Sequence, residues 1–302
     1  MTRHAARVGP VPPWSLAVAA MSSVQLGSAL STGLIGAIGP AGTAWLRLTI
    51  GAVILLVVAR PRPRSVRLRD APTLLGLGIT IGVQTIAFLA AIERIPLGTT
   101  VAIEFLGPLT VATVRRRHLR AFTWPVLALA GVVLLTQPWR GHVGLVGIGL
   151  AALAAVGWGA YILLTQRVGD RFDGITGLSL TMPVAAATAA ILGIPQAAGH
   201  LTLAIIGTGT GLAVLLPVLP YALEMLALRH IRPEAFGTLM ALEPGFSVLF
   251  GLLVLHQQPA LIQILGILLV IVAGSAAQRG SQRQPRPQPQ PVEPPDRVTG
   301  AT

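Results

Sequence analysis

Two apolar stretches of this sequence each carry a glutamate close to a proline. The first, VAIEFLGPLTVATV, holds Glu104 four residues before Pro108, and the second, TLMALEPGFSVLFGLLVL, holds Glu243 directly before Pro244. Proline has no amide N–H, so each proline leaves the backbone carbonyl four residues earlier without its helical partner. An ionisable group beside a broken helix, inside an apolar run, is typical of the binding site of a membrane carrier. The two stretches therefore predict a carrier with a central site lined by carboxylates.

Four charged residues fall inside the apolar runs: Arg47, Glu104, Glu224 and Glu243. A charge at the bilayer centre costs about 2.5–3.5 kcal/mol on insertion scales, so each needs a partner or a function. At 1.5 Å per residue, Glu104 and Glu243 each lie roughly 16 Å from the nearest arginine in a loop, which is near mid-membrane depth. A carboxyl group can exchange protons as well as bind a cation. Both glutamates are therefore predicted to couple protons and to contact the substrate.

The other two charges have two interpretations each. Arg47 lies near the depth of Glu104, so it could form a structural ion pair with that glutamate or bind a carboxylate of the substrate. Glu224 lies roughly 7 Å along its helix from Arg229, so snorkelling or an ion pair at an inner gate stands beside substrate contact. For Glu243, a position in a cavity is favoured over a protonated side chain bonded to backbone, because Arg47 is the only arginine within a span.

Further polar or amphipathic side chains within the apolar runs are candidates for lining the same cavity. They could equally form hydrogen bonds between helices or anchor a helix at the membrane interface. These candidates are Gln25, Gln84, Trp158, Tyr161 and Tyr221. Two glycine pairs, Gly78 with Gly82 and Gly207 with Gly211, have the spacing that lets helices approach closely, and both are predicted to pack against other helices.

The composition is that of an integral membrane protein. Hydrophobic residues make up 53% of the 302 positions and charged residues 11%, which excludes an ordinary soluble domain. A spanning helix needs roughly 20 apolar residues, and ten such runs are present. They begin near residues 14, 40, 71, 96, 121, 145, 174, 201, 234 and 261. The predicted fold is therefore all-α, with ten transmembrane helices.

The ten runs divide into two sets of five. Residues 14–138 are predicted to form one five-helix repeat and residues 144–277 a second. Because five is odd, the second repeat enters the membrane from the opposite side, which makes the repeats inverted. Residues 1–13 are expected to be a cytoplasmic N-terminal segment, and residues 278–302, rich in Pro, Gln and Arg, a disordered cytoplasmic tail.

The arginines set the orientation. The chain has 22 basic residues, all arginine, and counting 2, 5, 4, 2, 2 and 4 through the N-terminus, the alternate loops and the tail gives 19 on one side. Arg94 and Arg140 lie on the other side, and Arg47 lies within a span. Arginine-rich loops face the cytoplasm, so both termini are predicted to be cytoplasmic. The net charge of +12 is therefore explained by orientation, and no nucleic-acid partner is expected.

The inventory of reactive side chains argues against an enzyme. The chain has no cysteine, its six histidines and its aspartates lie in loops, tails or span ends, and no His-Glu-x-x-His motif occurs. No catalytic residue, cofactor or metal is therefore predicted. A passive channel would need rings of pore-lining groups supplied by an oligomer, whereas this chain carries its own duplicated halves.

Three motifs carry a resemblance to a known family. AIEFLGPL, YALEMLAL and FGTLMALEPGFSVLFGLLVL, with an arginine in the second span, resemble the EamA-type branch of the drug/metabolite transporter superfamily, specifically its threonine/homoserine exporters. The resemblance covers residues 14–277 and implies proton-driven export of small amino acids across the bacterial inner membrane. Many relatives carry Gly-Glu where this chain has His256 and Gln257, so no carboxylate there is given a role.

The substrate follows from the charges and from the resemblance. A zwitterion needs an anionic contact and a cationic one, and Glu104, Glu243 and Arg47 supply both. The expected partners are a small amino acid, protons and the lipid bilayer, with the chain acting as a monomer or homodimer. A lipophilic cation is the alternative substrate, because one glutamate and the aromatic walls of Trp158, Tyr161 and Tyr221 would suffice to bind it.

Overall fold

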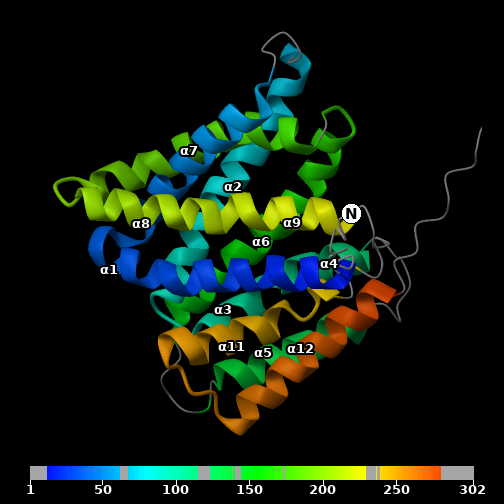
Figure 1. The fold of residues 1–302 in the computed structure, drawn as a ribbon. Helices are drawn as coiled ribbons and strands as arrows, with labels where there is room; N and C mark the ends of the chain where they lie inside the picture. Colours follow the sequence, from blue (N-terminus) through cyan, green and yellow to red (C-terminus); the bar gives the residue numbers. More distant parts are fainter. Residues whose placement is uncertain are drawn as a thin grey trace, which may run out of the picture.

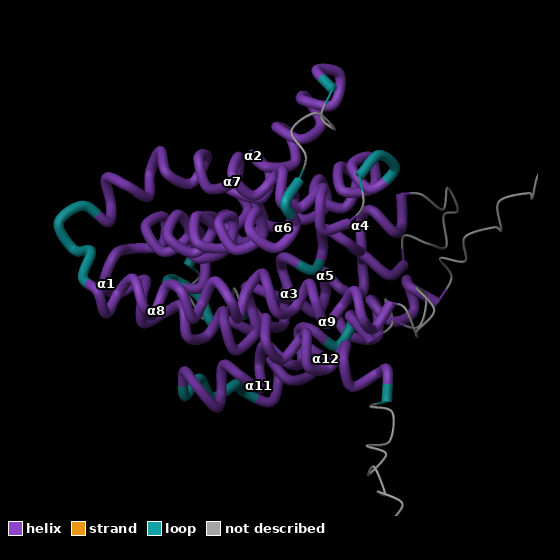
Figure 2. Tube along the Cα trace, turned by 45° about the horizontal axis from the view of Figure 1, so that its top comes forward, coloured by secondary structure: helices purple, strands orange, loops and turns teal. Residues whose placement is uncertain are grey.

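The described residues of the computed structural model form a bundle of helices (Figure 1). They comprise residues 12–61, 67–114, 123–137, 139, 144–172, 174–228, 236 and 239–279. Figure 2 shows helix and connecting loop throughout this part of the chain. The predicted N-terminal segment and the predicted tail lie outside it, except for residues 12 and 13 and residues 278 and 279.

The first half of the chain begins with one very long helical element. The elements of this half are α1 (Pro13–Ala59), η2 (Leu68–Asp70), α2 (Ala71–Ile92), α3 (Leu97–Glu104), α4 (Leu106–Val114) and α5 (Thr123–Thr136). The second half has α6 (Leu145–Gly169), α7 (Gly174–Ala197), α8 (Leu203–Ala213), η5 (Val214–Val218), α9 (Leu219–Leu228), α11 (Glu243–Leu255) and α12 (Leu261–Arg279).

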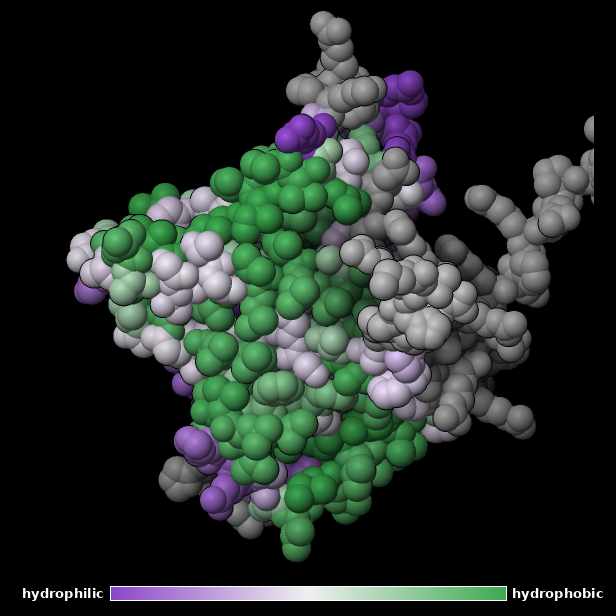
Figure 3. Space-filling view, in the orientation of Figure 1, coloured by the Kyte–Doolittle hydropathy of each residue, from purple (hydrophilic) through white to green (hydrophobic). Residues whose placement is uncertain are grey.

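The prediction of an all-helical membrane protein is confirmed. Within the described residues, six helical segments are long and apolar enough to cross a membrane, and three shorter apolar helices accompany them. Figure 3 shows hydrophobic side chains over much of the side of the bundle, where they would face lipid. The count of ten spans and the inverted repeat stay predictions.

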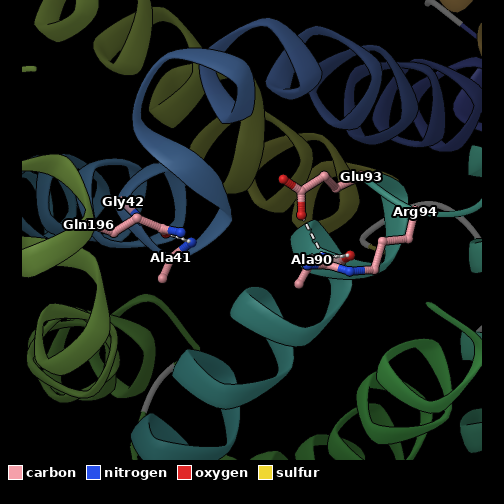
Figure 4. A network of polar contacts seen from close by, with 6 residues as sticks. All are labelled: Ala41, Gly42, Ala90, Glu93, Arg94 and Gln196. Carbon is pink, nitrogen blue, oxygen red and sulfur yellow. Dashed lines mark hydrogen bonds and ion pairs between the residues drawn. The ribbon is translucent and has the colours of Figure 1, made fainter. Parts of the chain in front are cut away.

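The first two predicted runs are joined in α1 by a turn at a single residue. Gly39 has φ +71°, a conformation that favours glycine, and it divides α1 into arms of residues 13–38 and 40–59. Pro40 begins the second arm, whose free N–H groups at Ala41 and Gly42 both donate to the side-chain Oε1 of Gln196 (Figure 4). A Cβ on Gly39 would lie 2.2 Å from the amide carbon of Gln196, so a larger residue would displace this side chain as well as strain the backbone.

The two glutamate-proline stretches fold differently from one another. In the first, the helix is interrupted at Phe105, so Glu104 ends α3 and Pro108 lies in the first turn of α4. In the second, Glu243 is the first residue of α11, and Pro244 follows at a position where a helix needs no N–H. Both stretches therefore have the helix break predicted beside the acid and the proline, after Glu104 in the first and before Glu243 in the second.

The two predicted glycine contacts also have different outcomes. Gly78 and Gly82 of α2 pack against α7, where an added Cβ would lie within 2.5–2.8 Å of Val184 and Ala185, so this prediction is confirmed. Gly207 and Gly211 of α8 have no described atom within 4 Å of the Cβ position, so the prediction for this pair is wrong. A different face of α8 makes the contact.

The helices connect alternately at two ends of the bundle. The Gly39 end, at the left of Figure 1, holds the turn of α1, the α2–α3 connection and the α7–α8 turn. The Arg60 end holds the start of α1, the end of its second arm and the end of α12. The first and last described helices therefore have their outer termini at the same end.

Candidate functional site

A cavity lies between the two halves of the bundle and has two adjoining lobes. The central lobe has a volume of about 390 Å³ and the side lobe about 210 Å³. Seven residues line both lobes: Arg47, Gln84, Thr85, Trp158, Tyr161, Leu216 and Glu224. The central volume falls within the roughly 300–1,000 Å³ of typical small-molecule sites.

The nine residues that the sequence nominated for the site all contribute to the lining of this cavity. The central lobe takes Gln25, Glu104 and Glu243, and the side lobe takes Tyr221. These side chains come from both arms of α1 and from α2, α3, α6, α9 and α11. The structure thus brings together residues that are up to 218 positions apart in the sequence. Their individual roles stay predictions.

Glu104 is held by a glutamine of the neighbouring helix. Gln84 Nε2 of α2 donates to Glu104 Oε1 at 3.0 Å, and only 7% of Glu104 is exposed. The interruption at Phe105 directly after Glu104 places this carboxylate at the end of α3. Phe105 itself packs edge-on against Trp158, with ring centroids 6.2 Å apart, which fixes the position of an aromatic wall of the cavity.

Glu243 has an equivalent arrangement with the first arm of α1. Gln25 Nε2 donates to Glu243 Oε1 at 3.2 Å, and Glu243 is 8% exposed. The carboxylate therefore lines the cavity and accepts a hydrogen bond from a side chain. The other amide atom of Gln25, Oε1, is buried and has no hydrogen-bond partner among the described residues.

Arg47 lines this cavity and forms no ion pair with any described residue. The ion pairs among the described residues join Arg94 with Glu93 and Arg171 with Asp70. Arg47 is 5% exposed, and one of its terminal nitrogens, Nη1, donates at 3.4 Å to the hydroxyl of Ser31. Its Nε has no partner in the described part of the chain. The proposed structural pair of Arg47 with Glu104 is therefore not formed in this conformation.

Glu224 and two tyrosines occupy the side lobe. Glu224 of α9 lines both lobes, together with Tyr161, while Tyr221 lines the side lobe alone. Contact with the substrate and snorkelling both stay predictions for Glu224. The alternative partner Arg229 lies outside the described residues, so an ion pair at an inner gate stays a prediction.

Ser31 is a site residue that the sequence did not identify. Its hydroxyl donates to the Gly27 carbonyl at 2.7 Å and accepts from Arg47, and it is fully buried. Helical periodicity offered only a partial signal, because Ser28 follows Gln25 by three residues and shares its face, whereas Ser31, six residues after Gln25, is rotated from it by about 120°. In the described residues no group of three His, Cys, Asp or Glu side chains could hold a metal ion.

Comparisons with known proteins agree with this architecture. Residues 145–275 match the EamA-like transporter family. The threonine/homoserine exporter RhtA of Salmonella typhimurium is 36% identical over 275 residues, which cover 88% of this chain and 91% of that protein. The chain belongs to the EamA-like transporter family. As a member of it, the protein is a multi-pass membrane carrier and not an enzyme.

Further relatives of this EamA-like transporter extend the comparison. RhtA of Escherichia coli is 35% identical over 265 residues, covering 86% of this chain and 89% of that one. The uncharacterized transporter YvbV of Bacillus subtilis is 28% identical over 154 residues, about half of each chain. A solved crystal structure with 21% identity covers 87% of this chain and 98% of its own, with a TM-score of 0.57, and so shares the fold.

Proposed function

We propose that this transporter exports small zwitterionic amino acids of the threonine or homoserine kind in exchange for protons. The observation that carries the proposal is a guanidinium, Arg47, that has no ion-pair partner among the described residues and lies in a cavity that also holds Glu104, Glu224 and Glu243. Burying a charge without a partner is unfavourable, so the arrangement favours a ligand that brings its own anionic group. The names of the RhtA relatives support an amino acid as that ligand.

The geometry complements a zwitterion. A substrate carboxylate would accept from the free nitrogens of Arg47, and a substrate ammonium would donate to Glu104 or Glu243. Each of these glutamates holds only a neutral amide as its described partner, so each carboxylate can bind one more donor. The contacts to a substrate would therefore use both signs of charge already present in the cavity.

Proton exchange follows from competition for the same carboxylates. A glutamate that binds the substrate ammonium must be ionised, whereas a protonated glutamate has lost that attraction. Substrate and proton would then occupy Glu243 or Glu104 in turn, which is the requirement for antiport. The binding site would open to one side of the membrane in one conformation of the bundle and to the other side in a second conformation.

The packing supports an inverted repeat of five helices. In such a repeat the second arm of α1 corresponds to α7, α3 and α4 correspond to α11, and α5 corresponds to α12. Each of these pairs is antiparallel here, because the end of one helix lies beside the start of the other in all three. Antiparallel equivalents are what an inverted repeat requires.

The arginine distribution supports an orientation with the Arg60 end in the cytoplasm of a bacterial cell. Both outer termini of the bundle would then be cytoplasmic, and the Gly39 end would face outward across the inner membrane. One chain supplies every described residue that lines the cavity, so a monomer or a homodimer would serve.

The test is transport in a bacterial host that lacks its own threonine exporters. Expression of the protein should raise tolerance to external threonine or homoserine and lower their intracellular pools. An uncoupler that dissipates the proton gradient should remove this effect. Unchanged amino-acid pools in cells that carry the protein in their membrane would contradict the proposal.

Export of lipophilic cations is the second candidate. The side lobe favours it, because Trp158, Tyr161 and Tyr221 form aromatic walls around Glu224. Expression would then raise tolerance to cationic dyes and leave threonine and homoserine pools unchanged. Measuring both tolerances in the same strain separates the two candidates.

A further inference from the structure

Three glutamines join the two halves of the transporter at the Gly39 end. Gln196 ends α7, Gln257 follows α11, and Gln263 lies in the first turn of α12. Each uses its side-chain amide to bond a main-chain atom of the first half. We call this set the glutamine clasp.

Gln196 makes the most extensive contact of the clasp. Its Oε1 accepts from Ala41 N at 2.7 Å and from Gly42 N at 3.1 Å, the free donors at the start of the second arm of α1. Figure 4 shows the amide of Gln196 pointing at these two residues. The contacts of Arg94 with Glu93 and Ala90 form a separate group in the same view. Gln196 thereby fixes the turn at Gly39 to the end of α7.

Gln257 and Gln263 repeat this contact at two other pairs of helices. Gln257 Oε1 accepts from Leu97 N at 3.1 Å, which caps the start of α3 from the end of α11. Gln263 Nε2 donates to the carbonyl of Leu135 at 3.1 Å, near the end of α5. Because the partners are a backbone N–H and a backbone C=O, the orientation of each amide is chemically determined.

The clasp lies at the end of the bundle from which the cavity is absent. Neither lobe is lined by any described residue within 29–46, 183–215 or 244–279, which hold the three glutamines and most of their surroundings. The side lobe instead extends toward the Arg60 end, where Leu178 and Glu224 line it. At that end Asp70 and Arg171 form an ion pair between the two halves.

We propose that the glutamine clasp holds the Gly39 end closed and must release for the cavity to open toward that side. The clasp joins those helices that an inverted repeat makes equivalent, so breaking it lets the halves separate at one end. This inference rests on the proposed alternating access and adds the residues that set which side is open. It does not depend on the chemical identity of the substrate.

The chemistry of the clasp gives a discriminating set of variants. Gln196→Ala and Gln257→Ala remove the acceptor, whereas Gln196→Glu and Gln257→Glu keep an oxygen at the same place beside a helix N-terminus, where negative charge is favourable. Gln263 donates to the Leu135 carbonyl, so Gln263→Glu should break that contact, although a carboxylate could still accept from Ala260 N. Replacement by Glu should therefore preserve the contacts of Gln196 and Gln257 but break the contact between Gln263 and Leu135.

The absence of cysteine from the chain makes a direct test possible. A single cysteine at Thr85, which lines both lobes, would be labelled in intact cells with a membrane-impermeant thiol reagent. The double variant Gln196→Ala with Gln257→Ala should raise the labelling rate by roughly tenfold or more, because several net hydrogen bonds no longer favour the closed end. The double Glu variant should be labelled at or below the parent rate.

Two controls separate release of the clasp from general loosening. Gln258→Ala removes a neighbouring exposed glutamine and should leave the labelling rate unchanged. Asp70→Asn weakens the ion pair between the halves at the Arg60 end and should not raise labelling from outside. The membrane level of each variant and its thermal stability in detergent identify variants that fail to fold.

The outcomes decide the proposal independently of the substrate. Ala and Glu variants of Gln196 and Gln257 that reach the membrane and are labelled alike would overturn the clasp. If the Ala variants are labelled faster than the Glu variants but the protein does not export threonine, the result would support the clasp and contradict the proposed substrate. Threonine export by a protein whose labelling rate does not change in the clasp variants would support the proposed substrate and contradict the clasp.

Discussion

Gly131 of α5 and Gly266 of α12 contact one another reciprocally, and a Cβ on either would lie 2.6 Å from the carbonyl oxygen of the other. The flanking contacts are also reciprocal, since Gly131 faces Val270 and Gly266 faces Leu135, each four residues beyond the opposite glycine. A contact that two chain segments make in the same way from both sides lies on a local twofold axis. The contact between α5 and α12 is therefore locally symmetric.

This contact predicts a strong effect of a very small substitution. Gly131→Ala should destabilise the protein by about 1–3 kcal/mol, because the added methyl group meets a backbone oxygen that cannot rotate away. Thermal unfolding in detergent would measure the loss. Gly149→Ala is the matched control, since nothing lies within 4 Å of its Cβ position, and it should have little effect or a small stabilising one. Equal melting temperatures for the two variants would contradict the close approach.

Glu243→Gln should abolish gradient-driven export while the protein still inserts into the membrane. The substitution keeps the size of the side chain and its contact with Gln25 but removes the group that exchanges a proton. Glu104→Gln should also impair export. Transport by everted vesicles, measured with and without an imposed pH gradient, checks both variants.

Glu93→Gln is a suitable control, because Glu93 is a surface acid paired with Arg94 and lies outside the cavity. Its transport should match that of the parent. Export by Glu243→Gln at the parent rate between about pH 6 and pH 8 would place the proton on another residue.

Arg47→Gln should raise the KM for a zwitterionic substrate by roughly tenfold to a hundredfold, the range expected for loss of a charge-assisted hydrogen bond. Arg47→Lys keeps the charge and should restore part of the affinity. The amino alcohol threoninol, which lacks the carboxylate, provides the decisive comparison. The inhibition constant of threoninol should be the same in the parent and in Arg47→Gln. An equal loss of affinity for threonine and threoninol would show that Arg47 acts on structure alone.

The orientation can be checked with two single cysteines at opposite ends of the bundle. Arg69→Cys, at the Arg60 end, should resist an impermeant thiol reagent in intact cells and react in everted vesicles. His200→Cys, in the α7–α8 turn at the Gly39 end, should show the opposite pattern. Reaction of Arg69→Cys from outside intact cells would reverse the proposed topology.

The membrane class and the family could be predicted from the sequence, and so could nine of the side chains that line the cavity. Burying Glu104 or Arg47 in lipid is unfavourable enough that their presence in apolar runs already points to a cavity. The motifs around Glu104 and Glu243 were sufficient to indicate the family. These signals are local, so one sequence suffices to detect them.

Contacts between distant residues could not be predicted in this way. The glutamines that hold Glu104 and Glu243 were candidates for cavity lining, but their pairing depends on side-chain geometry across 20 and 218 positions. The failed packing prediction for Gly207 and Gly211 has the same cause, because glycine spacing does not say which face of α8 meets a neighbour. Nor does the type of Gln257 reveal that its amide caps a helix 160 positions earlier.

The turn at Gly39 leaves the two arms of α1, which are the first two predicted membrane passes, with no linker between them. A chain that reverses at one residue, with the next two amides bonded to Gln196, offers no segment in which an epitope tag, a protease site or an inserted domain could be accommodated. The first two passes would therefore enter the bilayer together as a hairpin, and engineered insertions into this transporter belong at other connections.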